Sequence, residues 1–169
     1  KNNFIDFTNL VIMSKKKERY VSKNNQNIRR ISDLIKIAPN SKILIVYRNP
    51  LDQCISLLRQ HKSFLNLSKD DFFYKIYFKL TCHYEFGPLY KPFINKKISH
   101  KNPLELNHWL EQWINSYLYL FGKYKNDSNV KFVCSDKFNN KVYWANTLNF
   151  IGVKFFRYNF KIPNKLSTS

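Results

Sequence analysis

A strand that leads directly into a capped helix is the feature that most limits the fold of this chain. Residues 43–47 are an unbroken apolar run rich in β-branched side chains, typical of a parallel strand covered on both faces. Asn49 is a good N-cap, Pro50 suits the first helical position, and Asp52 complements the helix dipole. Because parallel strands are joined by crossover helices, this junction predicts an α/β fold with helices beside a parallel sheet.

The same junction carries the first indication of chemistry. A helix that begins at the carboxyl end of a parallel strand binds anions, because its unpaired N–H groups point outward there. Arg48 adds a fixed, bidentate cation at this point, and Ser56 follows eight residues later on the helix. The sequence therefore predicts a phosphate- or sulfate-binding corner. The alternative is an ordinary strand–helix junction with no ligand.

This segment resembles the motif with which the sulfotransferase family grips the 3′-phosphate of its donor, 3′-phosphoadenosine 5′-phosphosulfate (PAPS). The resemblance implies that Arg48 and Ser56 bind that phosphate and that Arg59 approaches the donor from the same helix. Lys23, 25 residues before Arg48, resembles the lysine that lies near the transferring sulfuryl group in the tyrosylprotein and bacterial members. An exposed lysine without a catalytic role is the alternative for Lys23.

Two later segments extend the resemblance to about residues 17–153. Residues 130–138 look like the family's strand and the Tyr-Glu-Asp-Leu sequence after it, with Ser135 and Asp136 at the first two positions. Residues 147–153 look like the Phe-Leu-Gly ending of the next helix. The implied structure is a P-loop-NTPase-like sulfotransferase fold, a parallel sheet flanked by helices, in one partial domain over residues 1–169.

One element of the family's pattern is missing. The family begins with a strand and a glycine-containing loop that cradles the 5′-phosphosulfate, but none of Gly87, Gly122 and Gly152 opens such a loop. The first residue is Lys1, so we expect the domain to be N-terminally incomplete. The implied activity is sulfuryl transfer from PAPS to a hydroxyl or amine of a glycan, peptide or small molecule, although the chain would hold only an incomplete, inactive portion if the loop is absent.

The strong positive charge favours a second hypothesis. The chain has 29 Lys and Arg against 11 Asp and Glu, a formal net charge of +18, which is typical of nucleic-acid-binding proteins. However, Lys, Asn, Ile, Phe and Tyr are all frequent while Gly and Ala are scarce, as AT-rich coding produces, and the lysines are scattered. We therefore favour a solvated basic surface that steers an anionic donor, and keep a nucleic-acid- or polyanion-binding module, or a degenerate non-catalytic domain, as alternatives.

Composition limits the remaining classes. Cys54, Cys82 and Cys134 lie far apart in apolar neighbourhoods, which indicates buried free thiols in a reducing, cytoplasmic compartment rather than a metal site. The four histidines show no metal spacing either. No apolar run approaches the ~18 residues of a membrane span, and the first residues do not form a signal peptide.

The remaining pattern predicts a short series of helices and strands. We expect strands near 17–22, 42–48 and 130–134, and helices near 28–38, 50–61, 69–84, 103–125 and 141–151, with a loop over 85–101. Three parallel strands would bring Lys23, Arg48 and Ser135 to one edge of the sheet. The helix near 69–84 should begin at Ser68 and turn these side chains inward: Phe72, Phe73, Ile76 and Leu80.

Overall fold

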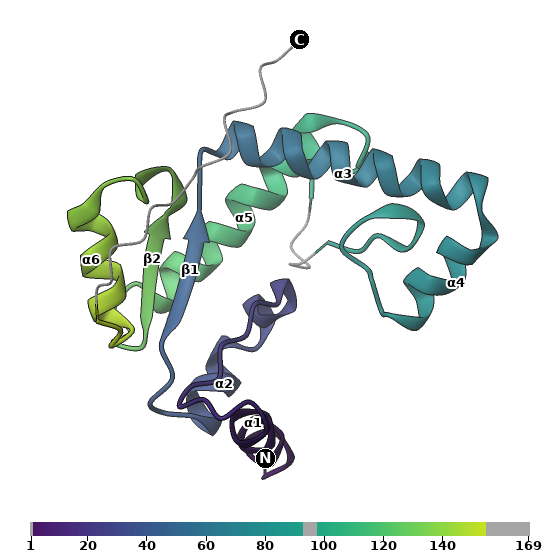
Figure 1. The fold of residues 1–169 in the computed structure, drawn as a ribbon. Helices are drawn as coiled ribbons and strands as arrows, with labels where there is room; N and C mark the ends of the chain where they lie inside the picture. Colours follow the sequence, from purple (N-terminus) through teal and green to yellow (C-terminus); the bar gives the residue numbers. More distant parts are fainter. Residues whose placement is uncertain (1, 93–97, 155–169) are drawn as a thin grey trace.

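Helices surround a small parallel sheet in the computed structural model, which describes residues 2–92 and 98–154 (Figure 1). The elements are, in order, α1 (Asn2–Ser14), η1 (Asn25–Arg29), α2 (Ile31–Ile37), β1 (Ile43–Tyr47), α3 (Pro50–Asp70), α4 (Phe72–Leu80), η2 (Gly87–Leu89), α5 (Leu106–Tyr124), β2 (Val130–Cys134), η3 (Ser135–Lys137) and α6 (Lys141–Phe150). The predicted mixture of helices and parallel strands is therefore confirmed. The P-loop-like arrangement stays a prediction.

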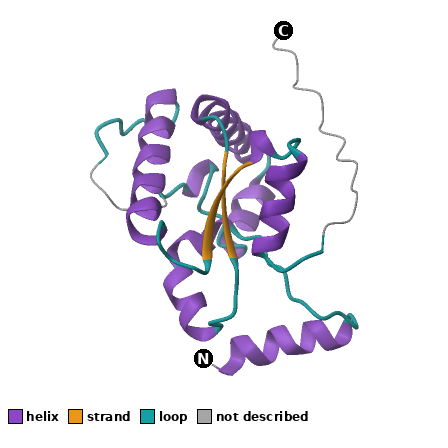
Figure 2. Ribbon diagram, turned by 90° about the vertical axis from the view of Figure 1, so that its left-hand side faces the viewer, coloured by secondary structure: helices purple, strands orange, loops and turns teal. Residues whose placement is uncertain are grey.

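The described sheet has two strands, β1 and β2, which pair in parallel from Ile43 opposite Val130 to Tyr47 opposite Cys134. In the described part of the chain the helices α3, α4 and α5 lie between these strands, as a parallel crossover requires. Figure 2 shows the twisted pair of strands between helices on either side. The strands predicted near 42–48 and 130–134 are confirmed.

The strand predicted near 17–22 is wrong. This segment forms no regular element, and all of its side chains are exposed, so the alternation that suggested a strand buries nothing. The Arg19 guanidinium instead donates to the carbonyl oxygens of Ile151 and Gly152, just beyond α6. The segment is therefore held by side-chain hydrogen bonds to the C-terminal end of α6, and not by the backbone hydrogen bonds of a sheet.

One apolar cluster joins the sheet to α2 and α5. Its buried members are Ile31, Ile45, Leu120, Tyr124 and Val130. The Tyr124 hydroxyl is satisfied by the Ser32 hydroxyl at 2.7 Å, so α5 and α2 share a hydrogen bond at the edge of this apolar contact. Leu120 and Tyr124 of α5, the helix predicted near 103–125, thus serve core packing.

A second cluster joins α3, η2 and α5 around Cys54, Phe86 and Trp109. The chain approaches α3 closely at Gly87, whose φ is +76°. A Cβ at Gly87 would lie 3.1 Å from the Phe64 Cβ, so both the backbone conformation and the space favour glycine.

The predicted boundary between the two helices after β1 is wrong. α3 continues to Asp70, well beyond the predicted end at residue 61. The Ser68 hydroxyl does not cap a helix but donates to the Leu65 carbonyl within α3. Asp71 caps α4 instead, by accepting a hydrogen bond from the Phe73 N–H at 2.7 Å.

The prediction of the inward side of α4 is also wrong. The side chains expected to be buried, Phe72, Phe73, Ile76 and Leu80, are all exposed. Phe78 is the buried residue of α4, and its ring stacks on Phe64 of α3 at 5.1 Å. The prediction failed because apolar residues occupy most positions of α4, so periodicity alone does not identify the inward face.

Asn2–Ser14 form helix α1, which is not among the helices expected from the sequence. Cys54 is buried as expected, but Cys82 is exposed and Cys134 only half-buried, so the prediction of three buried thiols is wrong. None of the helices within residues 2–92 and 98–154 combines the length and apolar character that a membrane span requires.

Candidate anion-binding site

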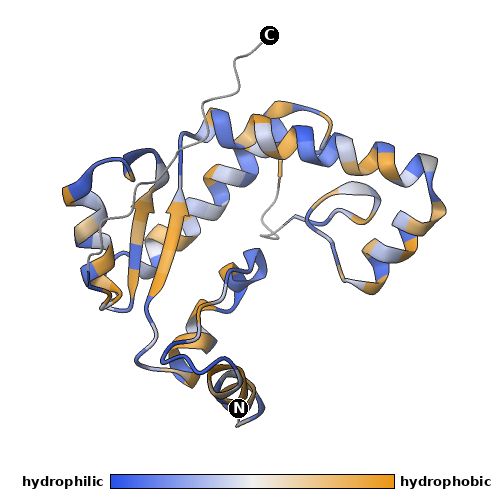
Figure 3. Ribbon diagram, in the orientation of Figure 1, coloured by the Kyte–Doolittle hydropathy of each residue, from blue (hydrophilic) through white to orange (hydrophobic). Residues whose placement is uncertain are grey.

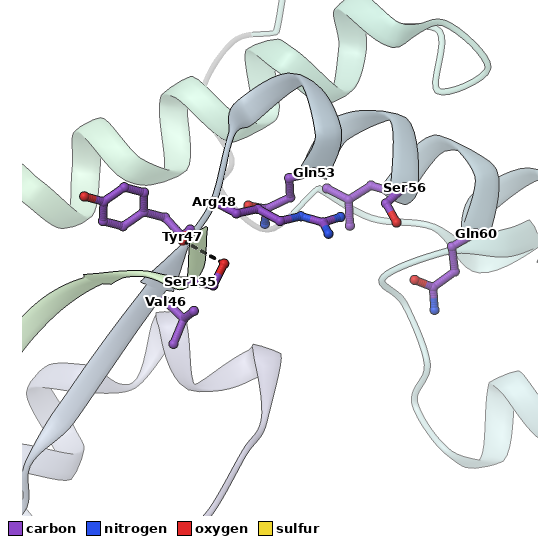
Figure 4. Close-up of a pocket in the computed structure, with 8 residues that line it drawn as sticks. Val46, Tyr47, Arg48, Gln53, Ser56, Gln60 and Ser135 are labelled. Atoms are coloured by element: carbon purple, nitrogen blue, oxygen red, sulfur yellow. Dashed lines mark hydrogen bonds between the residues drawn. The ribbon is translucent and has the colours of Figure 1, made fainter. Parts of the chain in front are cut away.

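A cavity of ≈ 280 Å³ lies where β1 passes into α3 (Figure 4). Its walls come from the end of β1, from one side of α3 and from the first residue after β2. The lining residues are Val46, Tyr47, Arg48, Gln53, Ser56, Leu57, Gln60 and Ser135. The carboxyl ends of both described strands therefore meet at this cavity, as expected for a ligand site on a parallel sheet.

The structure brings Arg48 and Ser56 together on this cavity. Arg48 stands just before α3 and its side chain extends along the first turns of the helix toward Ser56 (Figure 4). One guanidinium nitrogen, Nη2, donates to the Asp52 carbonyl at 3.2 Å, which fixes this direction. Among the described residues the other guanidinium N–H groups have no protein acceptor, so they can bind an anion in the cavity.

The unpaired helix amides that the sequence led us to expect are not present. The Asn49 side chain accepts hydrogen bonds from the N–H groups of Leu51 and Asp52, at 2.9 and 3.3 Å. The Gln53 N–H donates to the Asn49 carbonyl, and the Asn49 N–H donates to the Asp136 carboxylate at 2.9 Å. The helix N-terminus is therefore satisfied internally, and an anion here depends on side chains.

Ser135 reaches the same edge of the sheet as Arg48, as the parallel topology predicted. Its hydroxyl lies 3.3 Å from the Tyr47 carbonyl, to which it donates, so it ties the start of η3 to the end of β1. The carboxylate of the neighbouring Asp136 accepts a hydrogen bond from the Asn49 N–H. The two residues that follow β2 thus help to fix the strand–helix junction.

Lys23 and Arg59 are not among the residues that line this cavity. Both are exposed, and Lys23 lies in the irregular segment before η1, where Asn24 caps the short helix by accepting the Gln26 N–H. The strand that would have placed Lys23 at the sheet edge does not form. The roles of Lys23 and Arg59 therefore stay predictions.

Sequence reasoning missed Gln53, Leu57 and Gln60. Helical spacing was the available signal, because residues three or four apart lie on one side of a helix. Gln53 and Gln60 lie three residues before and four residues after Ser56, and Leu57 lies four residues after Gln53. Gln53 is held by the Trp113 indole N–H, which donates to its Oε1 at 3.2 Å. Gln53 also forms a side-chain hydrogen bond with Tyr117 of α5, so α5 holds this residue at two points.

The Cys54 thiol and the Tyr47 hydroxyl near the cavity both stay protonated at neutral pH. Burial raises the pKa of the Cys54 thiol to about 11, although the Arg48 cation opposes this shift. Burial also raises the pKa of Tyr47, helped by the neighbouring Cys134 and Tyr143. Since the lining residues include no His, Asp, Glu or Lys, the cavity as described offers anion binding and not an obvious general base.

No metal centre accompanies this cavity in the described part of the chain. Residues 2–92 and 98–154 hold no group of three or more His, Cys, Asp or Glu side chains arranged to hold an ion.

Part of the chain that forms this site matches a known protein family. Residues 4–85, which run from α1 to just before η2 and include Arg48 and Ser56, match the Sulfotransferase family. The resemblance to sulfotransferases is thus confirmed for this segment, and it begins further upstream than expected. The match gives no subtype and does not extend to residues 130–153. Comparisons with curated proteins and with solved structures find no match.

Proposed function

We propose that this chain carries the nucleotide-binding part of a sulfotransferase that uses PAPS as its donor. The observation that carries the proposal is that Arg48, in the junction after β1, and Ser56, eight residues later on α3, line one cavity at the end of β1. The match of residues 4–85 to the Sulfotransferase family also supports it. The reaction would transfer a sulfuryl group to a hydroxyl or amine of a glycan, peptide or small molecule.

In this proposal the 3′-phosphate of the donor enters the cavity. The Arg48 guanidinium would donate two N–H groups to it, and the Ser56 hydroxyl a third hydrogen bond. The amides of Leu51 and Asp52 are already bound to Asn49. In this proposal Arg48 and Ser56 therefore supply most of the affinity for the 3′-phosphate. The net charge of +18 adds long-range attraction for the polyanionic donor.

Transfer would break the bond between sulfur and the bridging oxygen of the 5′-phosphosulfate and form one from sulfur to the acceptor atom. The electron pair leaves with the 5′-phosphate, and the acceptor proton passes to a base outside the described lining of the cavity. As in phosphoryl transfer, positioning and electrostatic stabilisation dominate. In the proposal Lys23 neutralises charge at the bridging oxygen.

Calorimetric titration with adenosine 3′,5′-bisphosphate tests the binding step. Hydrogen bonds to charged groups contribute about 1.5–3 kcal/mol, so Arg48→Ala should weaken binding roughly 10- to 150-fold and Ser56→Ala roughly tenfold. Lys62→Ala removes one charge from an exposed position of α3 outside the cavity and is the matched control. Arg59→Ala tests whether Arg59 contacts the nucleotide: a contact predicts a larger loss of affinity than Lys62→Ala gives, and general charge attraction predicts an equal loss. Equal losses in the Lys62 and Arg48 variants, or no binding by the parent chain, would refute the proposed site.

A polyanion-binding module is the second candidate, favoured by the net charge of +18. It predicts binding to single-stranded nucleic acid or heparin with a steep logarithmic dependence on salt. That binding should be insensitive to Ser56→Ala, which removes no charge. Nucleotide affinity that depends on Ser56 would favour the sulfotransferase over this alternative.

A further inference from the structure

Helix α4 exposes a continuous apolar surface. Five of its nine residues are large apolar or aromatic side chains with 42–78 % of their surface exposed: Phe72, Phe73, Ile76, Tyr77 and Leu80. At 100° per residue they cover an uninterrupted arc of about 140° of the helix. We refer to these five side chains as the α4 apolar face.

This face is not the inner side of the helix. The side of α4 that packs on the protein holds Phe78, which is buried, and Tyr74 beside it. Phe78 stacks on Phe64 and lies against His83, so α4 is attached to α3 through residues opposite to the exposed arc. The helix is therefore already packed on one side, and the α4 apolar face is exposed to solvent. Figure 3 shows the apolar residues along α4.

The charge on α4 indicates the kind of surface that would cover this face. Lys75 and Lys79 border the apolar arc on one side, and α4 contains no acidic residue. The whole chain carries a net charge of +18. Apolar and aromatic side chains next to lysines on a short amphipathic helix match the interface of an anionic lipid bilayer, in which rings enter the headgroup layer and lysines contact the phosphates.

We propose that α4 docks this protein on an anionic lipid bilayer. A second copy of the chain fits less well, since the α4 apolar face exposes roughly 600 Å² against about 800 Å² per partner in a stable dimer. Two copies would also bring together surfaces of high like charge. The bilayer sets no minimum area, and its anionic lipids are complementary to the chain.

The place of α4 in the fold is compatible with the nucleotide site. α4 lies beyond the far end of α3, whereas Arg48 precedes the first turn of that helix (Figure 1). The protein could therefore bind a bilayer and a nucleotide at the same time. Bilayer docking does not depend on the proposed sulfotransferase function, and failure of either leaves the other intact.

Vesicle sedimentation provides the test. The chain should bind vesicles of phosphatidylcholine and phosphatidylserine in equal parts, and much less to phosphatidylcholine alone. Phe72→Ser with Leu80→Ser should lower the partition coefficient at least roughly tenfold, because two large apolar side chains no longer leave water. Lys75→Gln or Lys79→Gln should lower it about fivefold each. Val142→Ser, an equally exposed apolar position on α6, is the matched control and should change nothing.

A second readout locates the contact. Cys82 is exposed and follows α4 directly, so a polarity-sensitive dye on this thiol, in a Cys134→Ser background, should shift to the blue when vesicles are added. An unchanged dye, or partitioning that is equal in the double serine variant and the parent, would overturn the proposal. The proposal would also be overturned if the parent chain were a dimer in analytical ultracentrifugation and the double serine variant a monomer. Unaltered circular dichroism establishes that each variant is folded.

Discussion

Acid should weaken the packing of η2 and α5 on α3 because of His61. This α3 side chain is only 2 % exposed, and its Nδ1 accepts a hydrogen bond from the buried Gly87 N–H at 3.2 Å. Its ring lies edge-on to Tyr90, at 5.2 Å, and 5.5 Å from Trp109. A proton on Nδ1 would replace this acceptor with a donor that faces another donor, and would add a buried charge.

The pKa of His61 is lowered from 6.5, first by burial and then by the neighbouring His108. In the pH range between the folded and unfolded pKa values, the unfolded chain therefore binds a proton that the folded chain does not. The free energy of unfolding then rises with pH. The contribution is fully present above about pH 6.5 and is lost as the pH falls through the lower, folded pKa.

Urea unfolding over a series of pH values, with two substitutions, measures this contribution. His61→Asn places an amide oxygen near the position of Nδ1, so it can keep the bond from Gly87 and cannot titrate. Its unfolding free energy should vary less with pH than that of the parent chain. His61→Leu leaves the Gly87 N–H without a partner and should cost about 1–3 kcal/mol even above neutral pH.

The other groups around His61 provide the counter-test. His108 on α5 is also buried, with its Nε2 2.8 Å from the Tyr90 hydroxyl and its Nδ1 at the His100 carbonyl. If His61→Asn retains the full acid sensitivity of the parent and His108→Asn abolishes it, the reasoning for His61 is refuted. The buried hydrogen bond to Gly87 would then contribute to structure without titrating.

Two further predictions concern backbone and tertiary links. Gly87→Ala should destabilise the protein by at least about 1 kcal/mol, because Gly87 has a positive φ and lies close to α3. Gly122→Ala should stabilise it by about 0.5–1 kcal/mol, because nothing lies within 4 Å of a Cβ at this position of α5. Thermal unfolding of both variants, which carry the same change of residue, shows whether the backbone conformation decides the effect. Arg19→Ala should increase hydrogen exchange at the end of α6 near Gly152, because it removes two carbonyl contacts there, while Lys17→Ala, from the same exposed segment, should not.

Local signals predicted the junction at the centre of this fold correctly. The apolar run over β1, the Asn49 cap and the first turn of α3 all appear where the sequence placed them, because each depends on residues next to one another in the chain. The parallel pairing of β1 with β2 was also predictable, since both strands are largely apolar and helical connections between strands are typical of parallel sheets. The inward face of α4 was not, because apolar side chains surround most of that helix.

The candidate site shows why a correct local prediction can still give an incorrect chemical one. Asn49 was identified as the cap, and capping means that its side chain takes the Leu51 and Asp52 amides. The same residue therefore removes the unpaired N–H groups on which the predicted anion site partly relied. What remains to hold an anion is Arg48 and Ser56, whose proximity depends on the path of α3 after the strand. Replacing Asn49 with Gly would release both amides at a cost of only a few tenths of a kcal/mol in capping. Tighter binding of adenosine 3′,5′-bisphosphate by that variant would establish that the cap competes with the ligand, and unchanged binding would establish that the amides point elsewhere.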